Sequence, residues 1–311
     1  MNSLKIKGLS VYFPTDDGIV KAVDGVDLNI DEGETLGLIG ETGCGKTVLG
    51  MSIMRLIQSS TLTEGEIIYK DRDLLSLSDD EMRKIRGGEI AMVLQNPMTS
   101  LNPVIRVGEQ IAETIRLHQG LDRKAARKRV IEMLRDVRIP DPEKSVDSYP
   151  HQLSGGMRER VMIAMALASD PELIIADEPT KGLDVTVKRQ IIRLMKDVTA
   201  RKSMLFITHD LGAAAEVCDD IVVMYSGELL EYASVDYIFS EPLHPYTKGV
   251  LSSLPERGLK PIRGISPSLI DMPEGCRFHP RCDNVMEICK EKHPEMVKLE
   301  DGRSVRCFLY A

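Results

Sequence analysis

GETGCGKT, from Gly40 to Thr47, is the most informative segment of this chain. The apolar run TLGLIG leads into it and TVLGMSIMRLI follows it, so the sequence predicts a strand, a tight loop and a helix that begins near Lys46. In such loops glycines aim backbone N–H groups at a polyphosphate, the lysine reaches its β and γ oxygens, and the hydroxyl ligates Mg²⁺. We therefore expect nucleotide binding, with Thr47 on Mg²⁺, at Gly40, Glu41, Thr42, Gly43, Cys44, Gly45, Lys46, Thr47 and Val48.

Three more blocks follow in order: LSGGMRER at 153–160, LIIADEP at 173–179 and FITHD at 206–210. LIIAD is typical of a buried strand, and it ends in Asp177, whose carboxylate can hold Mg²⁺ through water. The adjacent Glu178 can orient or deprotonate an attacking water. His209 follows the apolar run MLFI and can donate to a terminal phosphate, although a lone histidine there is more often a satisfied core residue. Together the blocks predict a site that hydrolyses ATP.

Composition limits the other classes of function. The chain has 311 residues, 42% apolar and 28% charged, which is enough to bury a substantial core. A net charge of −8, the lack of tryptophan and an aromatic share of 4% disfavour nucleic acid as a partner. No run approaches the roughly 18–20 apolar residues that span a bilayer, and MNSLKIKGLS lacks the apolar core of a secretion signal. We expect a cytoplasmic chain whose membrane role requires a spanning partner.

Apolar runs alternate with helical patterns along most of the chain, which is typical of an α/β fold. LIIAD, MLFITHD and IVVMY are predicted parallel strands, and TVKRQIIRLMKDVTA and LGAAAEV are predicted helices. Residues 96 to about 160 are expected to form a helical insertion, because Val130, Leu134 and Val137 repeat at helical spacing. The basic run at 127–129 is then interpreted as the wet face of a helix rather than a binding patch.

The last seventy residues differ in character. Repeated prolines predict a linker at 241–274 with one short helix at YTKGVLSSL. Residues 275–311 then hold four of the six cysteines: Cys276, Cys282, Cys289 and Cys307. Disulfides do not suit a chain without an export signal. The gaps of five, six and seventeen residues lack the short C-x₂-C pairs of zinc sites and bacterial ferredoxins, so they predict one centre of four thiolates and leave the metal open.

A family resemblance now becomes clear. GETGCGKT, Gln95 in VLQNP, LSGGMRERVMIAMAL, LIIADEPTKGLD and ITHD match, in order and spacing, the nucleotide-binding subunits of ATP-binding-cassette (ABC) transporters. The resemblance covers residues 1–240, where it implies the ABC ATPase domain. It implies a P-loop NTPase core with a mixed sheet in a RecA-like lobe, an antiparallel β subdomain and an α-helical subdomain. It also implies that two subunits sandwich two ATP molecules.

The resemblance assigns roles to further residues. It places three of them at a helix N-terminus, where they would grip the γ-phosphate held by the opposite subunit: Ser154, Gly155 and Gly156. Gln95 would contact Mg²⁺ or water and relay to the membrane subunit, and Asp184 would lie in the loop that crosses the dimer. Phe13 would stack on adenine, with Tyr12 as the alternative, because only one of two successive rings on a strand can face the nucleotide.

Departures from the family pattern are small. Glu159 stands where a glutamine is usual, and Lys181-Gly182 replace the commoner Thr-Ala before Leu183. Neither removes a catalytic group, so the chain is expected to contribute fully active half-sites. The expected catalytic residues are Lys46, Gln95, Glu178 and His209.

The tail, with HPYTKGVLSSLP and SPSLIDMPEGCRFHPRC, resembles the C-terminal extension of oligopeptide and dipeptide importer ATPases. In that family the four cysteines hold a [4Fe-4S] cluster; zinc is the alternative, and an unmetallated thiol cluster a third. The resemblance implies a peripheral subunit at the cytoplasmic face of the membrane that powers the import of di- or oligopeptides. Its partners would be a second ATPase subunit, two membrane-spanning permease subunits and an extracytoplasmic solute-binding protein. The alternatives are import of a nickel chelate or oligosaccharide, export, a soluble ABC ATPase of translation or repair, or a metal-sensing scaffold.

Overall fold

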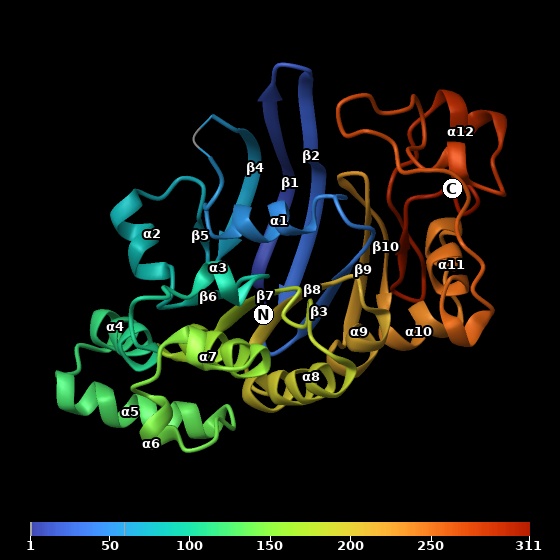
Figure 1. Cartoon of the computed structure of the whole chain (residues 1–311). Helices are drawn as coiled ribbons and strands as arrows, with labels where there is room; N and C mark the ends of the chain where they lie inside the picture. Colours follow the sequence, from blue (N-terminus) through green and yellow to red (C-terminus); the bar gives the residue numbers. More distant parts are fainter. Residues whose placement is uncertain (1, 59) are drawn as a thin grey trace. The chain divides into compact units, whose positions relative to one another are not determined.

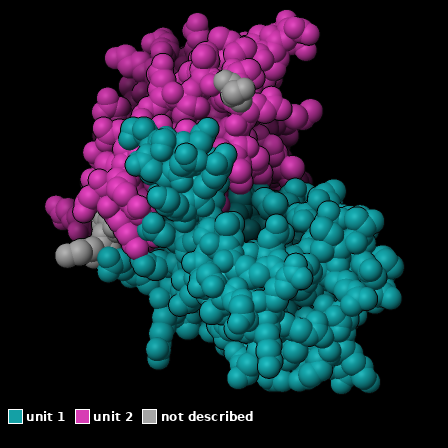
Figure 2. Space-filling view, turned by 90° about the vertical axis from the view of Figure 1, so that its left-hand side faces the viewer, with its two compact units in different colours: residues 1, 31–35, 76–206 teal, residues 2–30, 36–75, 207–311 magenta. Residues whose placement is uncertain are grey.

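A computed structural model describes residues 2–58 and 60–311. The chain divides into two compact units (Figure 2). Within the described residues, unit 1 comprises 31–35 and 76–206, and unit 2 comprises 2–30, 36–75 and 207–311. Both ends of the described chain therefore belong to unit 2. The predicted boundaries near residues 240 and 275 remain predictions, because both fall inside one unit.

Unit 2 contains an antiparallel sheet with the strand order β2-β1-β4-β5. Its strands are β1 (Asn2–Thr15), β2 (Gly18–Asp31), β4 (Leu62–Tyr69) and β5 (Arg72–Asp73). Buried and solvent-facing residues alternate toward the end of β2, as expected for a strand with one face on a core. The two N-terminal strands, dark blue in Figure 1, confirm the strands predicted before the glycine loop.

Unit 2 also contains strands of a second, mixed sheet. In unit 2 the parallel pair β3 (Thr35–Ile39) and β9 (Asp220–Tyr225) continues antiparallel into β10 (Glu228–Ser234). The short β12 (Ser304–Val305) pairs with β10, and β11 (Val297–Lys298) pairs with β12. Parallel and antiparallel pairing together make this the mixed sheet that the family resemblance implies. Its C-terminal additions tie the last residues of the chain into the fold.

The helices of unit 2 are α1 (Lys46–Ile53), α9 (Leu211–Val217), α10 (Val235–Ser240), α11 (Pro245–Ser252) and α12 (Glu287–Glu291). Helix α11 confirms the short helix predicted at YTKGVLSSL. It is not a loose appendage, because Tyr246 is fully buried and belongs to one apolar cluster with strand residues such as Val223 and with Phe278. The C-terminal region therefore shares a core with β9.

Unit 1 holds the parallel pair β6 (Ile90–Val93) and β7 (Leu173–Asp177), and β8 (Ser203–Thr208) runs from unit 1 into unit 2. Its helices are α2 (Asp79–Ile85), α3 (Pro97–Ser100), α4 (Val107–Gln119), α5 (Arg123–Asp136), α6 (Pro142–Ser145), α7 (Gly155–Leu167) and α8 (Val185–Thr199). Every residue of β7 is buried, which confirms LIIAD as an interior strand.

The helical part of unit 1 follows the predicted pattern. Helix α5 begins after Asp122, whose side chain accepts a hydrogen bond from the N–H of Ala125 at 2.8 Å. Val130 and Leu134 are fully buried, and α4, α5 and α7 pack together (green to yellow-green in Figure 1). The helical insertion expected from residue 96 is therefore present. Within the described residues no helix is long and apolar enough to span a bilayer.

Candidate functional site

The glycine loop follows β3 and ends where α1 begins, as the sequence predicts. Gly45 has φ of 110°, and a Cβ there would stand 2.0 Å from the carbonyl oxygen of Ala22. A Cβ on Gly40 would stand 2.2 Å from the carbonyl oxygen of Met224. Gly43 has φ of 84° with open space around it. Two of the glycines are thus required by close backbone contacts and the third by its conformation.

Lys46 completes the loop. Its side chain is buried, and Nζ donates to the carbonyl oxygens of Gly40 at 2.8 Å and of Glu41 at 2.9 Å. The ammonium therefore lies on the concave side of the loop, among the backbone groups of its own turn. Cys44 is buried beside it, and burial raises the pKa of its thiol, so its side chain fills space in the loop without charge.

Glu41 connects the glycine loop to the C-terminal region within unit 2. Arg281 donates from Nη2 to Oε1 and from Nη1 to Oε2, both at 3.0 Å, and Ser266 Oγ also donates to Oε2. The backbone N–H of Glu41 donates to the hydroxyl of Tyr246 at 3.0 Å. Burial raises the pKa of Glu41, but the hydrogen bonds from Arg281 and Ser266 outweigh burial and hold the pKa below its usual value.

The two aromatic candidates for adenine lie on β1. The Tyr12 hydroxyl donates to Asp24, whose carboxylate also pairs with Arg277, and Lys21 Nζ lies 5.9 Å from the centre of the Tyr12 ring. Burial and the bond to Asp24 raise the pKa of Tyr12. The Tyr12 ring is thus engaged within unit 2, while Phe13 is half-buried and its adenine role remains a prediction.

The water-activating groups lie in unit 1, at the end of β7. Gln95 Nε2 donates to Glu178 Oε2 at 3.1 Å, and Lys181 Nζ lies 3.6 Å from the same oxygen. Glu178 has φ of 46°, which a residue with a side chain adopts only at a cost, and its side chain is buried next to the buried Asp177. The structure therefore brings Gln95 and Glu178 together, as a site for positioning water requires.

The signature block caps a helix. Ser154 precedes α7, and its hydroxyl accepts from the N–H of Met157 at 3.3 Å while its side chain stays exposed. A Cβ on Gly156 would stand 2.6 Å from Val187 Cγ1, so this glycine allows α7 and α8 to approach closely. Asp184 caps α8 by accepting from the N–H groups of Thr186 and Val187, both at 3.0 Å. The roles of these residues in a dimer remain predictions.

His209 follows β8 and is exposed, at the point where the chain enters α9. Its position after a fully buried strand agrees with the pattern from which it was selected. The glycine loop with Lys46, and His209, belong to unit 2. Gln95, Asp177 and Glu178 belong to unit 1. Each group is described within its own unit.

Glu159 is an unusual feature of α7. Its side chain is only 2% exposed, and burial raises the pKa of the carboxyl to about 8. One carboxyl oxygen, Oε1, has no hydrogen-bond partner among the described residues. The departure from the family pattern at this position thus places a titratable acid in a buried position, where the proton-bearing form of the carboxyl is favoured.

The four cysteines of the tail line one small cavity of about 10 Å³, together with apolar side chains such as Phe278 and Phe308. All four are buried and none forms a disulfide. Backbone N–H groups of Phe278, Asn284 and Leu309 point at the sulfurs of Cys276, Cys282 and Cys307. Among the described residues, however, no group of three or more His, Cys, Asp or Glu has the geometry of a metal site. The iron–sulfur cluster is therefore not shown.

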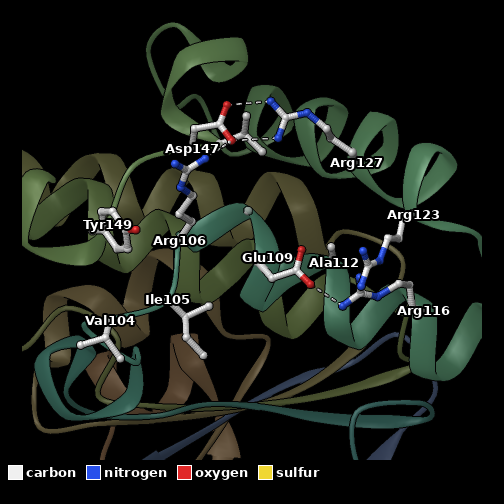
Figure 3. Close-up of a pocket in the computed structure, with 12 residues that line it drawn as sticks. Val104, Ile105, Arg106, Glu109, Ala112, Arg116, Arg123, Arg127, Asp147 and Tyr149 are labelled. Atoms are coloured by element: carbon white, nitrogen blue, oxygen red, sulfur yellow. Dashed lines mark hydrogen bonds and ion pairs between the residues drawn. The ribbon is translucent and has the colours of Figure 1, made fainter.

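A larger cavity of about 570 Å³ lies in the helical part of unit 1 (Figure 3). Figure 3 shows Arg106 and Arg127 pointing at the carboxylate of Asp147, and Arg116 pointing at Glu109. None of the predicted site residues lines this cavity. Size alone therefore does not locate the nucleotide site, whose residues are identified by sequence and contacts instead.

Sequence reasoning missed the residues that hold the glycine loop from the C-terminal side. Arg281, Arg277 and Tyr246 contact Glu41 or Asp24 over more than 200 positions of chain. No local pattern marks them, because a single arginine or tyrosine in a proline-rich segment has no periodicity to read. Finding them would have required knowing that the C-terminal region contacts the segment around the glycine loop.

Comparisons with known proteins agree with these observations. Residues 23–181 match the family described as "ABC transporter", and residues 230–289 match "Oligopeptide/dipeptide transporter, C-terminal region". The "Oligopeptide transport ATP-binding protein AppD" of Bacillus subtilis is 47% identical over 99% of this chain and 96% of its own length. "Dipeptide transport ATP-binding protein DppD" of the same organism is 46% identical over 98% of this chain and 94% of its own length.

Solved structures of similar fold are also known. A dimeric post-hydrolysis structure of the ATP-binding cassette MJ0796 with ADP and Pi superposes with a TM-score of 0.68 at 30% identity, over 75% of this chain and 98% of that one. The structure of cbiO1 from Clostridium perfringens, part of the ABC transporter complex cbiONQ, superposes with a TM-score of 0.65 at 27% identity. The match covers 77% of this chain and 91% of that one. The predicted fold class is confirmed, and the chain belongs to the ABC transporter ATP-binding proteins, in their oligopeptide/dipeptide transporter family.

Proposed function

We propose that this chain is the ATP-binding and ATP-hydrolysing subunit that powers an importer of di- or oligopeptides. The relatives that it matches almost end to end are named oligopeptide and dipeptide transport ATP-binding proteins. The observation that carries the hydrolytic part is the contact of Gln95 Nε2 with Glu178 Oε2 at 3.1 Å, next to Asp177 at the end of β7. A half-buried amide that donates to a buried carboxylate at this position suits the activation of water.

In this proposal Glu178 takes the proton of the attacking water. Gln95 and Lys181 both contact Oε2, which holds this carboxylate oxygen in place before the reaction. Lys46 and the N–H groups of the glycine loop hold the phosphates, and His209 donates to the γ-phosphate. Mg²⁺ would be held by Thr47, Gln95 and Asp177 and would neutralise charge on the phosphates.

Substitution of Glu178→Gln tests the role of the base. The variant should bind ATP as the unsubstituted chain does, yet lose at least about a hundredfold in turnover, because general-base catalysis contributes about 10²–10⁴-fold. The measurement is steady-state phosphate release by the assembled transporter. The matched control is Glu172→Gln, an exposed glutamate directly before the same strand, which should hydrolyse ATP at the normal rate. Normal turnover by Glu178→Gln would remove this residue as the base.

The assembly follows from the family. We propose that two cassettes close on two ATP molecules, with Ser154, Gly155 and Gly156 of each reaching the nucleotide of the other, and with Asp184 near the crossing. Hydrolysis would reopen the pair and move two permease subunits, which receive solute from an extracytoplasmic binding protein. The chain would then act at the cytoplasmic face of the membrane, without nucleic acid as a partner. The exposure of Ser154 and Gly155 at the N-terminus of α7 supports this arrangement, because a helix N-terminus favours an anion.

We also propose that Cys276, Cys282, Cys289 and Cys307 hold a [4Fe-4S] cluster, with zinc as the alternative. Three facts support the donor set: the four thiols line one cavity, none is oxidised to a disulfide, and backbone N–H groups point at three of the sulfurs. Such N–H groups stabilise thiolates and tune clusters. The cluster, when bound, would cross-link the C-terminal region.

Anaerobic purification with quantification of iron, sulfide and zinc tests the metal. We expect about four iron and four sulfide per chain, with the absorption of an iron–sulfur centre, and a loss of both in Cys282→Ser. Cys218→Ser is the matched control, because this cysteine lies outside the cavity and should leave the metal content unchanged. One zinc per chain without sulfide would select the alternative, and a metal-free chain would exclude both.

A further inference from the structure

Arg281 lies directly before Cys282, yet its side chain is buried against the glycine loop. The side chain is 6% exposed, and two of its nitrogens bind the two carboxylate oxygens of Glu41 at 3.0 Å each. Nη1 also lies 3.0 Å from Ser266 Oγ, and Nε donates to the carbonyl oxygen of Arg263 at 3.0 Å. All these contacts lie within unit 2. The guanidinium is therefore held in one orientation, in the two-pronged geometry that makes arginine–carboxylate pairs strong.

The charge of Glu41 is what makes this pair matter for nucleotides. Glu41 is the second residue of GETGCGKT, so its carboxylate stands in the loop that would receive a polyphosphate. The positive charge of Lys46 acts on this carboxylate, and Lys46 Nζ donates to the Glu41 carbonyl at 2.9 Å. Without a counter-charge, the carboxylate would repel phosphate and compete for Lys46. Arg281 supplies that counter-charge.

A second contact holds the same residue from the same side. The Glu41 N–H donates to Tyr246, whose ring lies 4.7 Å from the Tyr225 ring and 5.4 Å from the Phe278 ring, centre to centre. Phe278 also lines the cavity of the four cysteines. Because closely packed aromatic rings leave little free volume, a displacement of one ring also displaces its neighbours. The loop is thus anchored, by charge and by packing, to the segment that carries Cys276 and Cys282.

We propose that Arg281 is a positioning residue for ATP binding, which neutralises Glu41 and fixes the glycine loop, so that the Cys-rich region sets the affinity of the subunit for nucleotide. This inference rests on the proposed function, since it takes ATP as the ligand. It adds a contact that neither the motif blocks nor the cysteines reveal.

The experiment measures the Kd of ADP for the full chain by calorimetry, because ADP occupies the glycine loop and is not hydrolysed. Arg281→Met should bind ADP about tenfold more weakly, within the usual range of coupling between sites. Arg281→Lys keeps the charge and loses the two-pronged geometry, so it should fall between. Glu41→Gln in the Arg281→Met chain should restore the Kd to within about threefold, because it removes the uncompensated charge. A role limited to folding would not be reversed in this way.

Arg303→Met is the matched control, because Arg303 is an arginine of the same region that pairs with Asp301 and donates to the carbonyl oxygen of Glu241, away from the glycine loop. Its Kd for ADP should equal that of the unsubstituted chain. Normal ADP binding by Arg281→Met, or a double variant as weak as Arg281→Met alone, would overturn the inference. Failure of the unsubstituted chain itself to bind ADP would instead overturn the proposed function.

Discussion

Individual residues in this protein combine a special backbone conformation with a place in the candidate site. Gly45 permits a backbone approach that any Cβ would block, and Glu178 keeps a left-handed conformation next to Gln95. Such strained positions are retained where the surrounding structure specifies them, and here they lie where phosphate and water would be handled. Glu159 differs from these residues, because its buried carboxyl lies on α7 and is not one of the expected catalytic groups.

Glu159 should give the stability of the protein a pH dependence. Its pKa is raised from 4.5 to about 8 in the folded chain, so the folded state holds the proton more tightly than the unfolded state does. The free energy of unfolding should therefore fall as the pH rises from about 4.5 through about 8, by up to a few kcal/mol. Glu159→Gln should remove this fall and be more stable than the unsubstituted chain at pH 9, measured by urea unfolding from pH 5 to 9.

Glu113→Gln, an exposed position on α4, serves as the control and should keep the original pH profile. Parallel profiles for Glu159→Gln and the unsubstituted chain would show that Glu159 does not retain its proton on folding.

These residues also show where sequence reasoning succeeds. The glycine loop, Asp177 and Glu178 were predicted because each belongs to a motif of contiguous residues at the end of an apolar strand. Arg281 was not predicted, because its partner Glu41 lies 240 positions away and no local pattern marks this arginine. The cysteine spacing predicted one centre, and the cavity brings the four thiols together, but thiols alone do not select a metal.

Helices and strands were the easiest level to predict. Every residue of LIIAD is buried, and α5 buries the apolar positions that recur at helical spacing. Both were predictable, because the spacing of apolar residues along the chain follows from which face of an element is buried. Helix α11 was predicted only as a short helix in a linker. The surrounding prolines indicated a linker, so the full burial of Tyr246 was not predicted. The contrast between the two faces of α5 offers a direct test.

On α5, Val130 is fully buried, whereas Arg127 is half exposed and pairs with Asp147 at 2.7 Å. Val130→Ala should cost about 2 kcal/mol of unfolding free energy through lost burial and a cavity. Arg127→Ala should cost less than about 1 kcal/mol, because exposed ion pairs contribute little. Denaturant unfolding of both variants measures the difference. A larger loss in Arg127→Ala than in Val130→Ala would mean that the wet face, and not the core, holds this helix.

The whole chain is laid out so that neither unit is a continuous segment. Unit 2 contains the N-terminal strands, the glycine loop and the C-terminal region, while unit 1 holds the signature block and the carboxylate pair. In the proposed assembly one chain completes the site of another, and the exposure of Ser154, which also caps α7, suits that role. This predicts association that depends on nucleotide.

In the Glu178→Gln chain, ATP and Mg²⁺ should produce a dimer, alone or with the partner cassette, measured by light scattering. Adding Ser154→Asp should keep the protein monomeric, because the cap is preserved but a carboxylate now faces the γ-phosphate. Ser154→Asn caps equally well without charge and should still dimerise. Dimers that form equally with aspartate at this position would place the γ-phosphate elsewhere.

The reach of Arg277 back to Asp24, and of Arg281 back to Glu41, has a consequence for biosynthesis. The paired residues are 253 and 240 positions apart, so the early segment leaves the ribosome long before its arginines are translated. A nascent or prematurely terminated polypeptide would carry Glu41 without its counter-charge. On the proposed account such a fragment would capture nucleotide poorly, and only the finished polypeptide would engage the cell's ATP at full strength.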